Sequence, residues 1–295
     1  MDPLVIAFGL GVGILVGLTG IGGGSLMTPL LVIFIGTNPV VAVGTDIAYG
    51  AVTKTVGGYR HWRNGTVDLG VSKWLAFGSV PGSVAGVLVI SHLHHVHGDS
   101  FNDTLLWIVA AVLATTALIT LARALFMPAL VARERHEVML HTHTKVAAVV
   151  LGLVLGFALG MTSVGSGALV GLALILVFSL TPHRVVGTDV FHAAIMLWAA
   201  GIALLFVGNI DWGLMGTILI GSLPGVWIGE RLSRIVPATA LRPALGCVML
   251  GSALGVASKA GADLAAWQII GPPIAVGILA YGFHFVRERK VMVPA

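Results

Sequence analysis

Two glycine-rich segments that also carry hydroxyl groups stand 143 residues apart and are the first candidates for chemistry. They read Gly17-Leu-Thr-Gly-Ile-Gly-Gly-Gly-Ser25 and Gly160-Met-Thr-Ser-Val-Gly-Ser-Gly167. Where such a segment interrupts a helix, backbone N–H groups lose their helical partners, glycine lets a ligand approach, and the next helix presents its positive end. We predict two facing anion-binding helix breaks; the alternative is a tight turn that only needs glycine. The predicted substrate-binding residues of the breaks are Thr19, Gly22, Gly23, Gly24, Ser25, Thr162, Ser163, Gly165, Ser166 and Gly167.

A single lysine adds a positive charge to this picture. Lys54 lies about two thirds of the way along the apolar segment Val43–Tyr59. A lysine at the centre of a bilayer costs roughly 2.5–3.5 kcal/mol, so its presence favours a role as the counter-charge of a substrate. The alternative is a side chain that extends to the membrane interface near Arg60. The residue 143 positions later is Leu197, so the repeat does not require a lysine.

Two aspartates follow identical Val-Gly-Thr sequences and are candidates for capping or for carrying protons. Asp46 and Asp189 stand near the starts of predicted spans, where an aspartate commonly caps the following helix. His192 lies three residues after Asp189 and shares its helical face, and Tyr49 holds the position equivalent to His192. A proton relay through these four side chains is one hypothesis. A simply hydrogen-bonded histidine is the other.

Other chemistry finds no support in the sequence. The four histidines at positions 92, 94, 95 and 97 match no defined metal-site spacing, so no metal site is predicted. No G-x-S-x-G or HExxH motif occurs, and the glycine segments lack the third glycine and the preceding strand of a dinucleotide fingerprint. We therefore predict no catalytic residues, no cofactor and no enzymatic activity.

The elements that must position these residues follow from composition. Hydrophobic residues make up 57% of the 295 residues, charged residues only 9%, and mean hydropathy is +1.01. A soluble domain carries about 25% charged residues, so the composition excludes a soluble enzyme, a nucleic-acid binder and a disordered chain. The net charge of +4 indicates basic cytoplasmic loops. The prediction is an all-α integral membrane protein embedded in a lipid bilayer.

The spans follow from the length that a bilayer requires, about 20 apolar residues. Two apolar segments, 4–35 and 146–180, are too long for one span and are interrupted by the glycine motifs, so we predict two broken helical hairpins. The seven further predicted spans are Val43–Tyr59, Val71–Ser91, Leu105–Phe126, Val186–Val207, Trp212–Gly229, Ala240–Ala257 and Trp267–Val286. Basic loops place the C-terminus in the cytoplasm and the loop His92–Asp103 outside.

The chain also repeats itself at an offset of 143 residues. Val43-Gly-Thr-Asp46 matches Val186-Gly-Thr-Asp189, and glycines spaced four apart in the first arms of the hairpins match each other. The charge rule places the loop at Gly65–Asp68 inside and its copy outside, so the halves 1–144 and 145–295 are predicted to form one membrane-embedded body of inverted repeats. Inverted repeats with matching broken helices are typical of transporters, whose sites lie near the midplane. We assign the four-spaced glycines to helix packing.

These paired motifs resemble a known family. Gly20-Ile-Gly-Gly-Gly-Ser25, Val43-Gly-Thr-Asp46 with Thr53-Lys54, and Thr162-Ser-Val-Gly-Ser-Gly167 resemble the TauE/SafE family of sulfite-exporter or TSUP-type permeases. The resemblance implies a multi-pass transporter of a bacterial-type inner membrane for small, often sulfur-containing anions such as sulfite, thiosulfate or sulfoacetate, without a cofactor. A coupled proton and a homodimer remain open, and no nucleic-acid partner is expected. The alternatives are an anion channel that uses the breaks as a filter, and a permease for a carboxylate or another non-sulfur anion.

Overall fold

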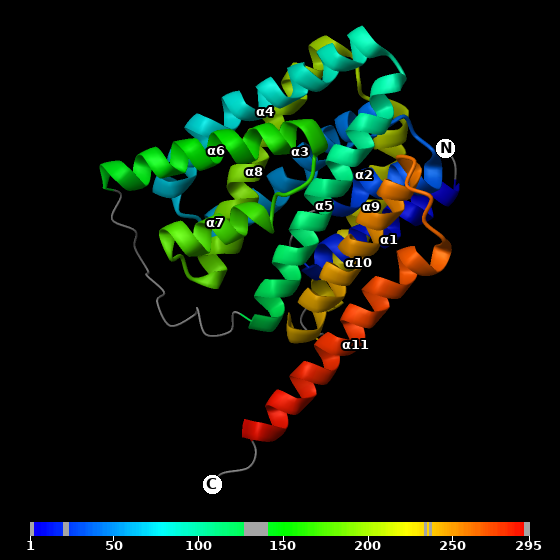
Figure 1. Ribbon diagram of the computed structural model, residues 1–295. Coiled ribbons are helices and arrows are strands. Elements are labelled where there is room, and N and C mark those ends of the chain that lie inside the picture. Colours follow the sequence, from blue (N-terminus) through cyan, green and yellow to red (C-terminus); the bar gives the residue numbers. More distant parts are fainter. Residues whose placement is uncertain (1–2, 20–23, 127–140, 233–234, 236–237, 292–295) are drawn as a thin grey trace.

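The computed structural model describes residues 3–19, 24–126, 141–232, 235 and 238–291 (Figure 1). These residues are organised in helices and form no sheet, as the sequence predicts. The helices are α1 Pro3–Thr19, α2 Gly24–Leu30 with the π-helical turn Leu31–Ile35, α3 Pro39–Arg63, α4 Leu69–His97, α5 Ser100–Phe126, α6 Thr142–Thr162, α7 Leu169–Phe178, α8 Pro182–Val207, α9 Trp212–Leu232, α10 Ala238–Lys259 and α11 Ala266–Val291.

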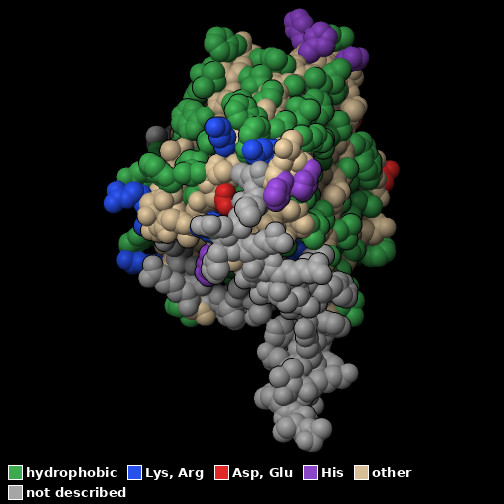
Figure 2. Space-filling view, turned by 90° about the vertical axis from the view of Figure 1, so that its left-hand side faces the viewer, with side chains coloured by type: hydrophobic (Ala, Val, Ile, Leu, Met, Phe, Trp, Pro, Cys, Tyr) green, Lys and Arg blue, Asp and Glu red, His purple; other side chains and the backbone are tan. Residues whose placement is uncertain are grey.

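Five of the described helices are long and apolar enough to cross a bilayer, namely α4, α5, α6, α8 and α9. All seven predicted further spans lie within helices, α3 to α5 and α8 to α11. The described side chains in the upper part of Figure 2 are largely hydrophobic with few charges among them, which suits contact with lipid. The protein is therefore a multi-pass, all-α membrane protein.

Both long apolar segments are divided into two helices at the glycine motifs. α1 ends at Thr19 and α2 begins at Gly24, while residues 20–23 lie outside the described part of the chain. α6 runs through Thr162, two residues further than Gly160, where the predicted break begins, and α7 starts at Leu169. α2 with its π-helical turn and α7 are both shorter than the spanning helices. The predicted broken hairpins are confirmed.

The predicted outer loop at 92–103 differs from the structure. α4 continues through His97 and α5 begins at Ser100, so the turn between them is short. The Gly98 N–H donates to the His94 carbonyl oxygen (2.8 Å) and closes the helix there. The histidines that suggested a solvated loop thus form the last turns of a helix, a conformation that charge patterning alone does not distinguish from a loop.

Helices from opposite halves pack closely through their small residues. α1 lies against α9 and α4 lies against α6, each pair running in the same direction. A Cβ atom on Gly9 would lie 2.6 Å from the Ile218 carbonyl oxygen, and one on Gly152 would meet the Leu75 carbonyl oxygen. The four-spaced glycines are therefore packing positions, as predicted, because any larger residue would separate the backbones.

The contacts between the halves occur in exchanged pairs. Gly9 meets Ile218, and the residues 143 positions away from these two, Gly152 and Leu75, meet each other. α3 and α8 hold equivalent places in the two halves and pack side by side in opposite directions. Where they cross, the Trp198 Nε1–H donates to the Thr55 Oγ1 (2.8 Å), and these two residues are themselves 143 positions apart.

The helix directions define two ends of the molecule. At the Asp68 end, α4, α6 and α8 begin and α3, α5 and α7 end; at the Asp211 end, α3 and α9 begin and α4 and α8 end. The basic residues with described side chains at the Asp68 end are Arg60, Arg63, Lys73, Arg123, Lys145, Arg184 and Arg231. At the Asp211 end the described part of the chain contributes Lys259.

Candidate functional site

The second break is an irregular loop shaped by left-handed backbone and by a threonine. Ser163, Gly165 and Gly167 have φ values of 58°, 111° and 94°. The Thr162 hydroxyl donates to the Ala158 carbonyl oxygen (2.7 Å) and accepts the Val164 N–H (3.2 Å). This hydroxyl was predicted to contact substrate, but the structure uses it to end α6, because a threonine hydroxyl can bond to the carbonyl four residues earlier.

Lys54 points to this break and not to the membrane interface. Its side chain is 5% exposed, and Nζ donates a hydrogen bond to the Ser166 Oγ at 2.6 Å. Two residues far apart in the sequence are thereby joined, one from α3 in the first half and one from the break in the second half. The alternative in which Lys54 extends to the interface beside Arg60 is wrong. A buried ammonium group requires partners of this kind.

Asp189 holds the N-terminal end of α7. Its Oδ1 accepts the Gly167 N–H at 3.2 Å, and its carboxylate interacts electrostatically with Lys54. The predicted role as N-cap of its own helix is wrong, since Thr181 is the N-cap of α8 and Asp189 lies buried two turns further along. A negative charge at the start of a helix is favourable. The protein's own carboxylate therefore uses a donor that was predicted to bind an external anion.

Asp46 plays the related part in the first half. Its Oδ2 accepts hydrogen bonds from the Thr28 hydroxyl (2.6 Å) and the Thr28 N–H (3.2 Å) of α2. The N-cap of α3 is Asn38, so the capping role predicted for Asp46 is also wrong. The carboxylate is buried and interacts with Lys54 and with Ser163 across the break. Lys54 thus lies among groups from both halves.

Tyr49 and His192 occupy equivalent places on either side of this centre. The His192 Nε2 lies 2.7 Å from the Ser79 Oγ of α4. The Tyr49 hydroxyl faces the Ser222 hydroxyl of α9 without a hydrogen bond of standard geometry between them. Ser79 and Ser222 are 143 residues apart, as are Tyr49 and His192. His192 is therefore paired with a serine hydroxyl, and the relay through Asp189 stays a prediction.

Several buried polar atoms at this centre have no hydrogen-bond partner. Unpaired buried polar atoms are uncommon in native proteins, and each costs about 1–3 kcal/mol unless a ligand or water satisfies it. Among the described side chains, the unpaired atoms in this region are Asp46 Oδ1, Tyr49 OH, His192 Nδ1 and Ser222 Oγ, and the Ser25 Oγ of α2 is unpaired as well. All five residues are buried. The cluster has the polar capacity to bind a small ligand.

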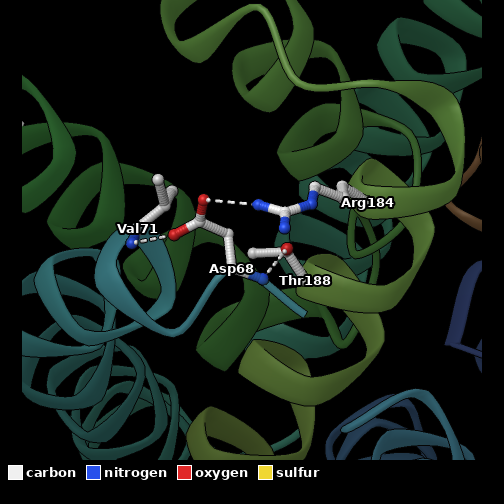
Figure 3. A network of polar contacts seen from close by, with 4 residues as sticks. All are labelled: Asp68, Val71, Arg184 and Thr188. Carbon is white, nitrogen blue, oxygen red and sulfur yellow. Dashed lines mark hydrogen bonds and ion pairs between the residues drawn. The ribbon is translucent and has the colours of Figure 1, made fainter. Parts of the chain in front are cut away.

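The threonines of the two Val-Gly-Thr-Asp motifs join the halves at opposite ends of the molecule. At the Asp68 end, the Asp68 N–H donates to the Thr188 Oγ1 at 2.9 Å, and Arg184 pairs with the Asp68 carboxylate at 3.5 Å (Figure 3). At the other end, the Asp211 N–H donates to the Thr45 Oγ1 at 3.1 Å. These are exchanged pairs again, and the position equivalent to Arg184 is Val41. The Asp68 end therefore carries an additional ion pair.

The structure places the predicted site residues in different ways. Lys54, Ser163, Ser166, Gly167 and the two aspartates lie together, while Thr162, Tyr49 and His192 have the surroundings described above. Gly165 lies in the second break and Ser25 lies in α2. Gly22, Gly23 and the side chain of Thr19 lie outside the described part of the structure, which includes Gly24 only as the first residue of α2.

Sequence reasoning missed the serines and Thr28. Ser79 and Ser222 follow glycines in matching copies, and a hydroxyl kept in both copies was a signal that could have identified them. Thr28 gave no such signal, because its counterpart is Gly171.

Comparisons with known proteins identify the family of this chain. Residues 5–256 match the family model described as "Sulfite exporter TauE/SafE". The chain belongs to the TauE/SafE family. It is 36% identical over 256 residues to the "Probable membrane transporter protein YjnA" of Bacillus subtilis, covering 86% of this chain and 99% of the relative.

Two more distant relatives carry similar names. The chain is 25% identical over 236 residues to the "Probable membrane transporter protein YdhB" of Bacillus subtilis, covering 79% of this chain and 91% of the relative. It is also 25% identical over 278 residues to a "Probable membrane transporter protein" of Xylella fastidiosa, covering 90% of this chain and 99% of the relative. No solved structure matches. This TauE/SafE protein is therefore a multi-pass membrane transporter.

Proposed function

We propose that this TauE/SafE protein is a secondary transporter of small anions, with sulfur-containing oxyanions or organosulfonates as the leading substrates. The observation that carries the proposal is the buried Lys54 ammonium group, which is bonded to Ser166 of a helix break. It also interacts electrostatically with Asp46 and His192, whose Oδ1 and Nδ1 atoms have no hydrogen-bond partner. A buried cation next to hydroxyl donors suits an oxyanion. The sulfur preference comes from the family description.

A coupled proton is part of this proposal. The charged groups that interact at the centre are Lys54, Asp46 and Asp189, with Arg123 acting on Asp189 from α5. Their formal charges cancel, so an anion adds uncompensated negative charge to a buried site, which is costly. We propose that Asp46 or Asp189 takes up a proton when the anion binds, with Tyr49 and His192 as neighbouring proton-carrying groups.

Alternating access is proposed to arise from an inverted repeat, residues 1–144 and 145–295. The exchanged contacts and the antiparallel packing of α3 on α8 support it, because an operation that superposes these two helices must reverse their direction. The site then lies where both halves meet, and rocking one half against the other exposes it to either side. The basic Asp68 end is the proposed cytoplasmic end, and the C-terminus of α11 lies on that side.

The test is saturable anion uptake into proteoliposomes, compared between Ser166→Ala and Ser83→Ala. Both serines are buried, but the Ser83 hydroxyl donates only to backbone carbonyl oxygens among the described contacts. Loss of a hydrogen bond to a charged group costs roughly 1.5–3 kcal/mol, so Ser166→Ala should weaken anion affinity about 10- to 100-fold. Ser83→Ala should stay within about twofold of wild type.

The same assay separates the alternatives. Sulfite, thiosulfate, sulfoacetate, sulfate and a carboxylate are compared as substrates in wild-type vesicles. Flux that does not saturate, together with conductance steps, would show that the protein is a channel and not a carrier. Uptake of the carboxylate alone would exclude specificity for sulfur-containing anions. Equal affinity in both serine variants would remove the Lys54–Ser166 pair from the site.

A further inference from the structure

Arg123 reaches from the end of α5 into the neighbourhood of the second break. Its Nη1 lies 3.3 Å from the position that a Cβ atom would take on Gly171, in the first turn of α7. The guanidinium group also interacts electrostatically with Asp189, whose carboxylate accepts the Gly167 N–H. Arg123 is half-buried, so it bridges the Asp68 end and the buried centre.

The two halves differ at the position that admits this side chain. Gly171 is the counterpart of Thr28, whose hydroxyl donates to the Asp46 carboxylate at 2.6 Å. In the first half, the aspartate therefore accepts a hydrogen bond from a neutral hydroxyl group. In the second half the glycine has no side chain, and the Arg123 guanidinium group lies against it. The second half thus supplies a positive charge where the first half supplies a hydroxyl.

Asp189 interacts with two cations of different accessibility. Lys54 is buried at the centre, whereas Arg123 is half-buried and enters from the Asp68 end, where α5 ends. The carboxylate interacts with both. An anion arriving from the Asp68 end would meet Arg123 before it meets Lys54. Two cations separated by one carboxylate give a short series of positions at which an anion can be bound.

We propose that Arg123 is a substrate-binding residue that forms an entry site for the anion at the Asp68 end, ahead of the central Lys54 site. This inference rests on the proposed function, because it requires that an anion is the substrate. A guanidinium group presents a planar fork of N–H donors that binds two oxygen atoms of one group at once. The entry site therefore selects oxyanions such as sulfonates, sulfite and carboxylates over halides.

The test measures anion affinity separately from the two faces of the protein, in inside-out and right-side-out vesicles. Arg123→Gln should raise KM about tenfold for uptake from the Asp68 end and leave uptake from the Asp211 end within about twofold. Arg123→Lys should rescue only part of this loss, because an ammonium group cannot form the fork. Gly171→Thr should raise KM from the Asp68 end, since its side chain takes the space next to the guanidinium group.

The matched control is Lys73→Gln, which removes an exposed positive charge at the same end, on α4. It should leave KM from both faces within about twofold, since the charge it removes is screened by water. If Lys73→Gln raises KM from the Asp68 end as much as Arg123→Gln does, Arg123 acts only through the general positive charge of this surface. That result would overturn the proposed entry site.

The outcomes distinguish this inference from the proposed function. If wild-type protein transports an anion with saturation, but Arg123→Gln and Gly171→Thr change KM from neither face, the entry site is wrong and the transporter stands. An equal rise from both faces assigns Arg123 to the central site and also overturns the proposal. If wild-type vesicles transport none of the anions, both ideas fail. Should Arg123→Gln not fold, Arg123→Lys and Gly171→Thr decide the question by the same KM comparison.

Discussion

At the residue scale, the last three residues of the first Val-Gly-Thr-Asp motif have separate roles that their spacing explains. Gly44 lies against the Asn209 carbonyl oxygen, where a Cβ atom would not fit. Thr45 accepts the N–H of Asp211 in the opposite half, and Asp46 turns one position further to bond α2. Successive helical residues point about 100° apart, so three neighbours contact three different partners.

Asp189→Asn should separate proton coupling from anion binding. Asparagine keeps an oxygen for the Gly167 N–H but cannot exchange a proton. Uptake driven by a pH gradient should fall at least about tenfold, while anion counterflow at equal pH stays within about threefold of wild type. Both rates are measured in the same proteoliposome preparation. The control is Asp263→Asn, at a described loop residue outside the helices. Equal loss of counterflow and driven uptake would contradict a proton role for Asp189.

The sequence predicted the types of residue at the site better than their partners. Lys54 was identified because a lysine within an apolar span is costly and rare. Capping was one predicted role of the aspartates because their positions near span starts resemble caps, but α3 and α8 begin about one turn earlier than the apolar segments do. Arg123 is not among the predicted site residues, since no spacing rule reveals that Gly171 leaves room for its side chain.

At the element scale, two parallel helix pairs from opposite halves form the frame around the breaks. α1 on α9 and α4 on α6 are held at short distance by glycines that face backbone atoms of the partner helix. Within a membrane, van der Waals packing of this kind replaces the hydrophobic effect as the main source of helix association. This close packing positions the ends of α1 and α6 against helices of the opposite half.

Two glycines of α1 offer a matched test of this frame. A Cβ on Gly13 would collide with the Ser222 backbone, whereas one on Gly11 would meet nothing within 4 Å. Gly13→Ala should destabilise the protein by about 1–3 kcal/mol through overpacking. Gly11→Ala should be neutral or stabilise it by up to about 1 kcal/mol, because alanine favours helix. Thermal melting in detergent measures both. Similar melting temperatures for the two variants would contradict the packing role of Gly13.

The breaks themselves were predictable from sequence because glycine and hydroxyl residues interrupt an apolar run that is too long for one span. Their detailed shape was not. Gly160 still belongs to α6 and packs against Ser83, and the break begins only at Ser163, whose φ of 58° is unusual for a residue with a side chain. Local composition marks an interruption, but tertiary contacts decide which residue leaves the helix.

At the scale of the whole molecule, the exchanged contacts mean that each half packs against and stabilises the other. Each frame pair takes one helix from each half, so neither half contains a complete site or a complete frame. This arrangement was foreseeable in outline from the 143-residue repeat, which predicted matching elements. Which helices would pair could not be predicted. A repeat shows which elements of the two halves are equivalent, but not whether an element packs within its own half or against the other half.

The orientation of the ends is tested with single cysteines in a Cys247→Ala background. Asn64→Cys at the Asp68 end should react with a membrane-impermeant maleimide only after cells are permeabilised, because that end holds most of the described basic residues. His95→Cys at the opposite end should react in intact cells. Both positions are exposed, so reagent access within an aqueous phase is comparable. Labelling of both residues from the same side would refute the proposed topology.

The bond between Thr55 and Trp198 has a consequence for how such a chain can arise by gene duplication. Because these equivalent residues touch, the adjacent positions 54 and 197 would also lie close to the symmetry axis of the proposed inverted repeat. Two identical subunits would place two lysines there, and like charges repel strongly away from water. When both copies are fused in one chain, one copy can keep the lysine while the other has leucine at the equivalent position. A fused chain can therefore form an asymmetric centre with a single lysine, which two identical subunits cannot form.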